Sequence, residues 1–296
     1  YRAAKSLNKK AYIVIDNPTS SIIPLMNTFR DNQDYEADMF VNNHEAKEIM
    51  DDNTLLVVVD TNKPSITQCE DLLYMAKMIV VLDHHRQGSD TIRNSVLSYI
   101  EPYASSASEM VAEILQYFTE GIRIRNVEAD SIYAGIMIDT DNFMQKTGVR
   151  TFEAAAFLRR CGADVTRVRK LFREDMNDYK ARGETIRNAE LFRGQFAISE
   201  CPSDYVDSPT VVGAQAANEL LNIVGVKASF VLTEYKGVIY ISARAIDEVN
   251  VQIIMERMGG GGHLNMAGCQ LETVNMEGAR SLLKSTLTEM QDGGEI

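Results

Sequence analysis

Cysteine is scarce in the sequence, and the residues present form no metal-binding pattern. The four cysteines are far apart and include no Cys-x-x-Cys pair: Cys69, Cys161, Cys201 and Cys269. Closely spaced cysteines are the usual ligands of a structural zinc ion. Their absence argues against a zinc knuckle and makes reduced, cytoplasmic thiols the expectation.

Long apolar runs and surplus positive charge are also missing. No stretch approaches the roughly 20 apolar residues of a membrane-spanning helix, and nothing resembles a signal peptide. The formal net charge of −12 opposes broad, nonspecific binding to a long nucleic acid. It leaves room for a small phosphorylated ligand held by a local cluster of metal ions or arginines.

The 296 residues suffice for two domains with a substantial core. In the first half, short aliphatic runs alternate with helical patterns. Strands that are apolar on both faces are predicted over 11–16, 55–60 and 78–83. The helices between them are predicted near 20–30, 44–51 and 66–77. This β-α-β rhythm predicts an α/β fold with a parallel sheet and helices on both faces.

Helices dominate the middle of the chain. They are predicted over 105–118, 127–143 and 151–160, and a long charged helix is predicted over 164–191. Ser106 and Glu109 have the spacing of a capping box at the start of the first of these helices. The long charged helix is a reasonable connection between two domains.

A second, smaller α/β domain is predicted after residue 190. It contains a strand at 195–200, a helix at 212–224 and a last helix at 276–292. Two alternating β runs flank Lys236-Gly237, which is a hairpin signal. The predicted domain limits are 1–165 for the first domain, 166–190 for a helical linker, and 191–296 for the second domain.

Each predicted strand of the first half ends in an acidic residue: Asp16, Asp60 and Asp83. In doubly wound sheets, ligands bind outside the carboxyl ends of the strands. An aspartate at a strand end is also a common cap or turn residue, and we prefer this interpretation for Asp16. Asp83 differs because two of the four histidines, His84 and His85, follow it directly.

Carboxylate and imidazole groups together suit a divalent ion such as manganese or iron. Asp139 and Asp141, which follow an apolar helix, could supply a further ligand. Two ions a few ångströms apart can hold a phosphate and lower the pKa of a bridging water. Because neighbouring side chains of an extended segment point opposite ways, we expect only one of His84 and His85 to be a direct ligand.

Four consecutive glycines precede His263. Such a run is costly in backbone entropy, so a positive φ or a close backbone approach must require it. A loop of this kind presents N–H groups to an anion, and His263 can donate to a phosphate. A flexible linker is the alternative, although the run lies between a helix and a predicted buried strand. Arg244, on the neighbouring hairpin, could form a charge-assisted fork with a phosphate or could simply lie at the surface.

Four segments carry a family resemblance, in the order VVVDTN, VLDHHR, GIMIDTDNF and GGGGHLNMAG. Together they resemble the DHH/DHHA1 phosphoesterase superfamily, and the resemblance covers essentially the whole chain. The sequence of residues 77–115 is similar to the membrane-anchored cyclic-di-AMP phosphodiesterases of this superfamily. The resemblance implies a DHH domain, a DHHA1 domain and two divalent ions, most often Mn²⁺.

The resemblance also implies roles for individual residues. Asp60 would bridge the two ions, and His84 and Asp139 would complete the second metal site. Asp83 would support His84 from behind, while His85 would face the scissile phosphate or the leaving group. The residues that would bind the nucleotide are Ser106, Arg244, Gly260, Gly261, Gly262 and His263.

One motif of the superfamily is missing. Its members begin with a strand that carries His-x-x-x-Asp-x-Asp, which supplies most ligands of the first ion. The present sequence starts with what looks like the end of the helix that follows this strand. We therefore expect an incomplete first metal site and a destabilised or partner-completed fold.

The resemblance implies a hydrolase that converts cyclic di-AMP to linear pApA. It further implies a homodimer, and a cytoplasmic domain whose parent protein has upstream membrane helices and sensory domains. Two alternatives stay open. One is a nanoRNase or pAp phosphatase that acts on short linear nucleotides. The other is a catalytically inactive nucleotide-binding sensor, which the missing motif favours.

Overall fold

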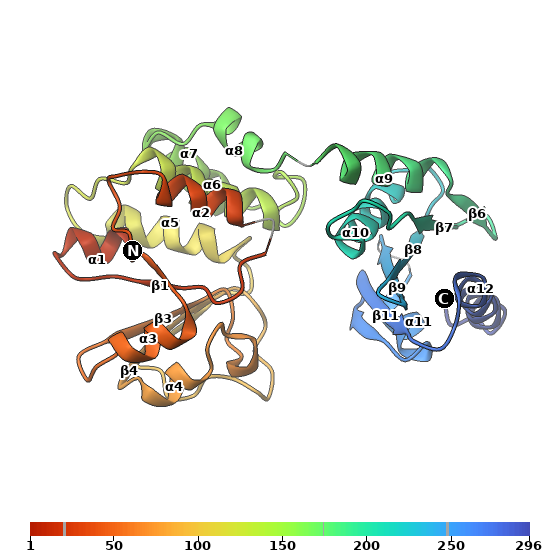
Figure 1. The fold of residues 1–296 in the computed structure, drawn as a ribbon, viewed down its shortest axis with the longest axis horizontal. Coiled ribbons are helices and arrows are strands. Elements are labelled where there is room, and N and C mark those ends of the chain that lie inside the picture. The colour runs from red at the N-terminus through yellow and green to blue at the C-terminus, as the bar shows by residue number, and fades with distance from the viewer. Residues whose placement is uncertain (20–21, 174, 247–248) are drawn as a thin grey trace. The chain divides into compact units, whose positions relative to one another are not determined.

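The computed structural model describes residues 1–19, 22–173, 175–246 and 249–296 (Figure 1). The chain divides into two compact units, Tyr1–Arg173 and Glu174–Ile296. The predicted α/β class with parallel sheets is confirmed. Within the part of the chain that is described, no helix combines the length and hydrophobicity needed to cross a bilayer.

A three-stranded parallel sheet lies at the centre of the first unit, with the order β3-β4-β5. Its strands are β3 (Leu55–Val59), β4 (Met78–Asp83) and β5 (Leu97–Ile100). The predicted strand at 11–16 is reduced to β1 (Ile13–Val14), which pairs with β2 (Phe40–Val41) in a separate two-stranded parallel sheet. The single predicted sheet is therefore two sheets among the described residues.

The prediction that all three strands are buried on both faces is wrong for β3. Its alternate side chains Leu55, Val57 and Val59 are 51%, 47% and 50% exposed, whereas Val58 is buried. Among the described residues, β3 is an edge strand of this sheet. Val58, with Ile79 and Val81 of β4, packs against Leu73 on the opposite face.

Helices surround these sheets, and the later ones form a compact cluster of their own. Small side chains such as Ala129, Ala134 and Ala154 let these later helices approach closely, and Leu158 and Val168 complete their shared core. The helices of the first unit are α1 (Arg2–Ser6), α2 (Ile23–Arg30), α3 (Asn43–Ile49), α4 (Asp71–Met75), α5 (Ala107–Phe118), α6 (Asn126–Asp139), α7 (Val149–Arg160) and α8 (Val165–Leu171).

Two predicted helix details need correction. The Ser106 hydroxyl accepts a hydrogen bond from the Glu109 N–H at 3.0 Å, but the Glu109 carboxylate accepts from Ser105 instead of closing the predicted capping box. The long helix predicted over 164–191 is two helices, α8 and α9 (Met176–Arg187). Asp164 and Asp175 cap their N-termini, as aspartate does well. The predicted domain limits stay a prediction.

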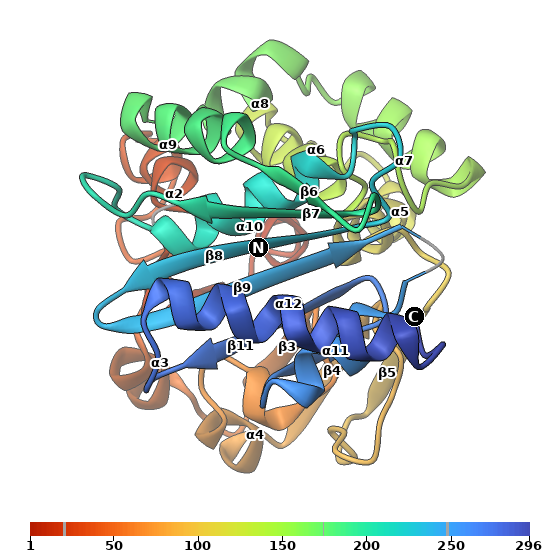
Figure 2. The same ribbon diagram turned by 90° about the vertical axis from the view of Figure 1, so that its right-hand side faces the viewer.

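The second unit is built on a six-stranded mixed sheet with the order β10-β11-β9-β8-β7-β6 (Figure 2). Lys236 and Gly237, both with positive φ, join β8 to β9, so the predicted hairpin is confirmed. The strands are β6 (Glu190–Phe192), β7 (Phe196–Cys201), β8 (Ala228–Tyr235), β9 (Val238–Ala245), β10 (Gly261–His263) and β11 (Met266–Leu271).

Helices cover both faces of this sheet. On one face, α11 (Val251–Arg257) and the predicted last helix, α12 (Met276–Asp292), enclose the largest core of the chain, in which Phe230 and Leu287 are fully buried. On the other face, α9 and α10 (Pro209–Leu220) form a smaller core with Val231. The polar side chains of β9 to β11 lie on this second face.

Candidate metal centre

Asp60 occupies the turn in which β3 ends. Its φ of 64° lies in the left-handed region, which aspartate tolerates better than most residues. The Asp60 N–H still donates to the Leu82 carbonyl at 3.0 Å, so the turn stays attached to β4. The carboxylate is 58% exposed at the carboxyl edge of the sheet, where a ligand is expected.

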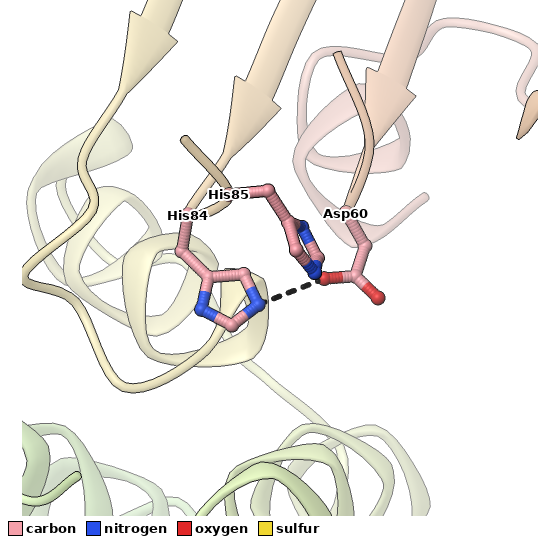
Figure 3. Close-up of side chains that lie close together, drawn as sticks. All are labelled: Asp60, His84 and His85. Carbon is pink, nitrogen blue, oxygen red and sulfur yellow. Dashed lines mark ion pairs between the residues drawn. The ribbon is translucent and has the colours of Figure 1, made fainter. Parts of the chain in front are cut away.

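His84 and His85 follow β4, the strand next to β3, and lie beside Asp60 (Figure 3). His84 Nε2 is 3.3 Å from Asp60 Oδ1. One potential ligand atom from each of Asp60, His84 and His85 lies within 4.8 Å of the others. The prediction that the two imidazoles diverge is wrong: the chain leaves its extended conformation after Asp83, and the rings lie 4.4 Å apart.

Asp139 is the last residue of α6 and approaches the same histidine. Its Oδ2 is 3.8 Å from His84 Nε2. Burial, and then the charge of Asp60, raise the pKa of the Asp139 carboxyl above its ordinary value. The C-terminus of a helix also disfavours a negative charge. A bound cation would offset both costs.

These separations fit ligands of a shared divalent ion. Ligand atoms about 2.1 Å from one ion lie about 3.0 Å apart at right angles and about 3.4 Å apart at the tetrahedral angle. The 3.3 Å and 3.8 Å separations at His84 are close to these values. Mixed carboxylate and imidazole donors suit a transition metal such as manganese, iron or zinc. The first unit therefore has a candidate metal centre at Asp60, His84 and His85, which Asp139 approaches through its contact with His84.

Asp83 supports a different histidine from the one expected. It is fully buried and accepts from His85 Nδ1 at 2.7 Å, whereas His84 Nδ1 lies 3.4 Å from the Ala104 carbonyl. The expected support of His84 by Asp83 is therefore wrong. Asn62 Nδ2 donates to the other Asp83 oxygen at 2.6 Å. Sequence analysis missed Asn62, although it follows Asp60 by two residues.

Three other predicted candidates lie outside this cluster. Asp16 accepts from the Asn43 N–H at the start of α3, which is the capping role preferred for it. Asp141 has a φ of 46° and contacts Gln145. Ser106 is fully buried and caps α5, so its placement already has a structural explanation. Its contact with a nucleotide stays a prediction.

In the second unit, Gly261 and Gly262 of the glycine run belong to the strand β10, where a loop was predicted. A Cβ at Gly260 would lie 2.1 Å from the Gly268 carbonyl oxygen, and one at Gly262 would lie 2.5 Å from Ala267 Cα. These two glycines therefore allow β10 to lie against β11. Gly261 has no atom within 4 Å of such a Cβ, so its surroundings are open.

Arg244 is adjacent to the glycine strand within the sheet. The register pairs His263 with Met266 and Met266 with Arg244, which puts all three on one face. Arg244 Nε is buried without a hydrogen-bond partner, and burial lowers the pKa of the guanidinium. No carboxylate of the described residues pairs with Arg244. Nη1 donates to the Ala243 carbonyl oxygen at 2.9 Å, so Nε is the donor without a partner. A partly buried guanidinium without a carboxylate partner is a candidate anion site.

The fold defines a two-unit α/β protein with a candidate carboxylate–imidazole metal centre in the first unit and a candidate anion site in the second. The family model of the DHH N-terminal domain matches residues 10–136, and that of the DHHA1 domain matches residues 196–289. The chain belongs to the DHH/DHHA1 family.

Curated relatives match nearly the whole chain. It is 41% identical to the cyclic-di-AMP phosphodiesterase GdpP of Bacillus subtilis, covering 99% of this chain and 45% of that protein. It is 38% identical to PdeA of Listeria monocytogenes, a protein of the same description, covering 97% and 44%. The chain thus spans less than half the length of these relatives.

A solved structure supports the fold independently. An exopolyphosphatase-related protein from Bacteroides fragilis superposes with a TM-score of 0.81 at 20% identity, covering 99% of this chain and 86% of that one. At this identity the likeness concerns the fold alone.

Metal affinity is predicted to depend on pH through His84. The hydrogen bond with Asp60 raises the pKa of His84 above its ordinary 6.5, and Asp139 adds to the increase. A metal ion must displace this proton, so affinity should fall as the pH drops through the raised pKa. Calorimetric Mn²⁺ titrations between pH 6 and pH 9 would measure this effect. An affinity that is constant over this range would exclude His84 as a ligand.

Proposed function

We propose that this chain is the catalytic region of a metal-dependent phosphodiesterase that hydrolyses cyclic di-AMP to linear pApA. The convergence of Asp60, His84 and Asp139 at the carboxyl edge of a parallel sheet carries the proposal. The names of the relatives in Bacillus subtilis and Listeria monocytogenes support the choice of substrate.

In the proposed mechanism, Asp60, His84 and Asp139 would hold a divalent ion, and the chemistry that this ion would supply is Lewis acidity and a lowered pKa of water at neutral pH. The His85 ring donates through Nδ1 to Asp83, which leaves Nε2 free to contact the phosphate or the leaving oxygen. Mn²⁺ is our choice of ion. The second ion of the expected pair stays a prediction, with Asp60 as its shared ligand.

The second unit supplies phosphate recognition in this proposal. Arg244 has unsatisfied donor capacity and lies on the same sheet face as His263. Gly261 leaves the neighbouring surface open. Arg244 and His263 would therefore hold the phosphate that is not being cleaved, while Gly260 and Gly262 keep their strand in place.

Relatives that are more than twice as long suggest further parts of the protein. Two more distant relatives, from phytoplasmas, are described as membrane protein fusions with ribosomal subunit bL9, and one of them is 34% identical over 300 residues. We propose that this chain is the cytoplasmic region of a membrane-anchored parent with upstream sensory domains, and that it acts as a homodimer.

Turnover of three substrates tests the proposal. The purified chain, titrated with Mn²⁺, is expected to cleave cyclic di-AMP faster than pApA or pAp. Faster cleavage of pApA or pAp would favour the bifunctional oligoribonuclease and PAP phosphatase activity named for the relative in Mycoplasma genitalium, which is 28% identical over 221 residues. Binding of cyclic di-AMP without hydrolysis at saturating Mn²⁺ would favour a sensor.

A further inference from the structure

Asn62 is a buried polar residue whose side-chain hydrogen bonds go to Asp83 and His85. It is 2% exposed. Its Nδ2 donates to Asp83 Oδ2 at 2.6 Å and lies 3.3 Å from the His85 carbonyl oxygen. The backbone carbonyl oxygen of Asn62 accepts from the Ile92 N–H at 2.9 Å. One residue thus joins the end of β4 to the segment that follows the histidines.

The amide of Asn62 is not explained by stability alone. Its Oδ1 is buried without a hydrogen-bond partner. An unsatisfied buried acceptor costs free energy, and an apolar side chain of similar size would avoid this cost. Natural proteins keep such costs mainly where a functional site requires them. The Nδ2 donor is therefore the part of the side chain that needs an explanation.

That donor acts on Asp83, and Asp83 acts on His85. One Asp83 oxygen accepts from Asn62, and the other accepts from both the backbone N–H and Nδ1 of His85. With Oδ2 held by Asn62, the carboxylate cannot rotate without losing a buried hydrogen bond. Its Oδ1 therefore stays aimed at His85 Nδ1. This fixes the ring with its proton on Nδ1 and its Nε2 free on the Asp60 side.

We propose that Asn62 is a positioning residue, which sets the tautomer and orientation of His85 through Asp83. The consequence for catalysis rests on the proposed phosphodiesterase function, but the structural consequence does not. Asn62 touches neither the substrate nor the reacting atoms in this proposal. Its effect on the His85 ring is transmitted through the Asp83 carboxylate, and its contact with the His85 carbonyl oxygen holds the backbone of the same residue.

The structural consequence can be measured in the metal-free protein. The chain has four histidines, so ¹⁵N spectra of histidine-labelled protein can be assigned from single substitutions. At pH 8, His85 in the wild type is expected to show the Nδ1–H tautomer alone. Asn62→Ala should give a mixture of both tautomers, while His44 and His263 are unchanged. An unaltered His85 spectrum in Asn62→Ala would overturn the proposal, whatever the activity.

Kinetics supply the second test. Asn62→Ala is expected to lower kcat for cyclic di-AMP by about 10-fold to 100-fold, the usual cost of removing a partner that orients a site residue. KM and Mn²⁺ affinity should stay near the wild-type values. Asn62→His should restore most of the activity, because its Nδ1–H is as far from Cβ as the asparagine amide. Failure of this rescue, with the Asn62→Ala protein folded, would count against the donor role.

Asn43→Ala is the matched control. Asn43 lies in the same unit, its Nδ2 donates to the Gln68 carbonyl, and its Oδ1 is also buried without a partner. Its hydrogen bonds among the described residues go to Asp16 and Gln68, which lie outside the candidate metal centre. The Asn43→Ala variant is expected to lose stability as Asn62→Ala does, but to keep the wild-type kcat and the wild-type tautomer of His85. An equal loss of kcat in both variants would show that Asn62 supports the fold and does not position His85.

Discussion

Asp60→Asn is expected to reduce the hydrolysis of cyclic di-AMP by about 10³-fold, which corresponds to about 4 kcal/mol of lost transition-state stabilisation. The amide keeps the shape of the side chain, and asparagine also tolerates the left-handed φ of 64° at this position. The fold should therefore survive while the charge that faces His84 and Asp139 disappears. Initial rates at saturating Mn²⁺, with circular dichroism as the check on folding, measure the effect.

Asp16→Asn is the appropriate comparison for this variant. Asp16 also follows a parallel strand of the first unit, but its Oδ1 accepts from the Asn43 N–H rather than facing the histidines. The kcat of Asp16→Asn should stay within about 2-fold of the wild type, and the loss of the cap should cost about 1 kcal/mol of stability. If both variants retained wild-type turnover, the candidate centre would not be the site of hydrolysis.

The residues of the metal centre could be predicted because their signal is local. Aliphatic runs that end in Asp60 and in Asp83-His84-His85 identify the carboxyl edge of a parallel sheet from the sequence alone. Asp139 could be proposed because it ends an apolar helix. The structure brings both Asp60 and Asp139 within 4 Å of His84.

Other features depend on contacts that no local pattern shows. The partner of Asp83 is decided by the bend after β4, which turns His85 toward it. The need for Gly260 becomes visible only when Gly268, eight residues later, is known to lie against it. The prediction of one long helix over 164–191 depended on composition, because charged residues of this kind favour a helix. Its division depends on Asp164 and Asp175, which cap two separate helices.

The most consequential prediction for the second unit concerns Arg244, where stability and binding should change in opposite directions. Arg244→Met keeps an unbranched chain and removes a guanidinium whose Nε is buried without a partner. Removing such a group should raise the free energy of unfolding by about 1–3 kcal/mol. If the guanidinium instead binds a phosphate, its loss should raise KM for cyclic di-AMP by about 10-fold to 100-fold.

Both effects follow from one cause, which makes the pair of measurements more decisive than either alone. A partly buried guanidinium that pairs with no carboxylate of the described residues is a cost to the free protein, and an anionic ligand that pairs with it recovers this cost on binding. Because the chain contains no tryptophan, urea unfolding is best followed by circular dichroism. Arg257→Met is the control, since Arg257 is an exposed partner of Glu295 in the same unit and should change KM little. An Arg244→Met protein that is less stable than the wild type, with an unchanged KM, would show that Arg244 serves the fold rather than the ligand.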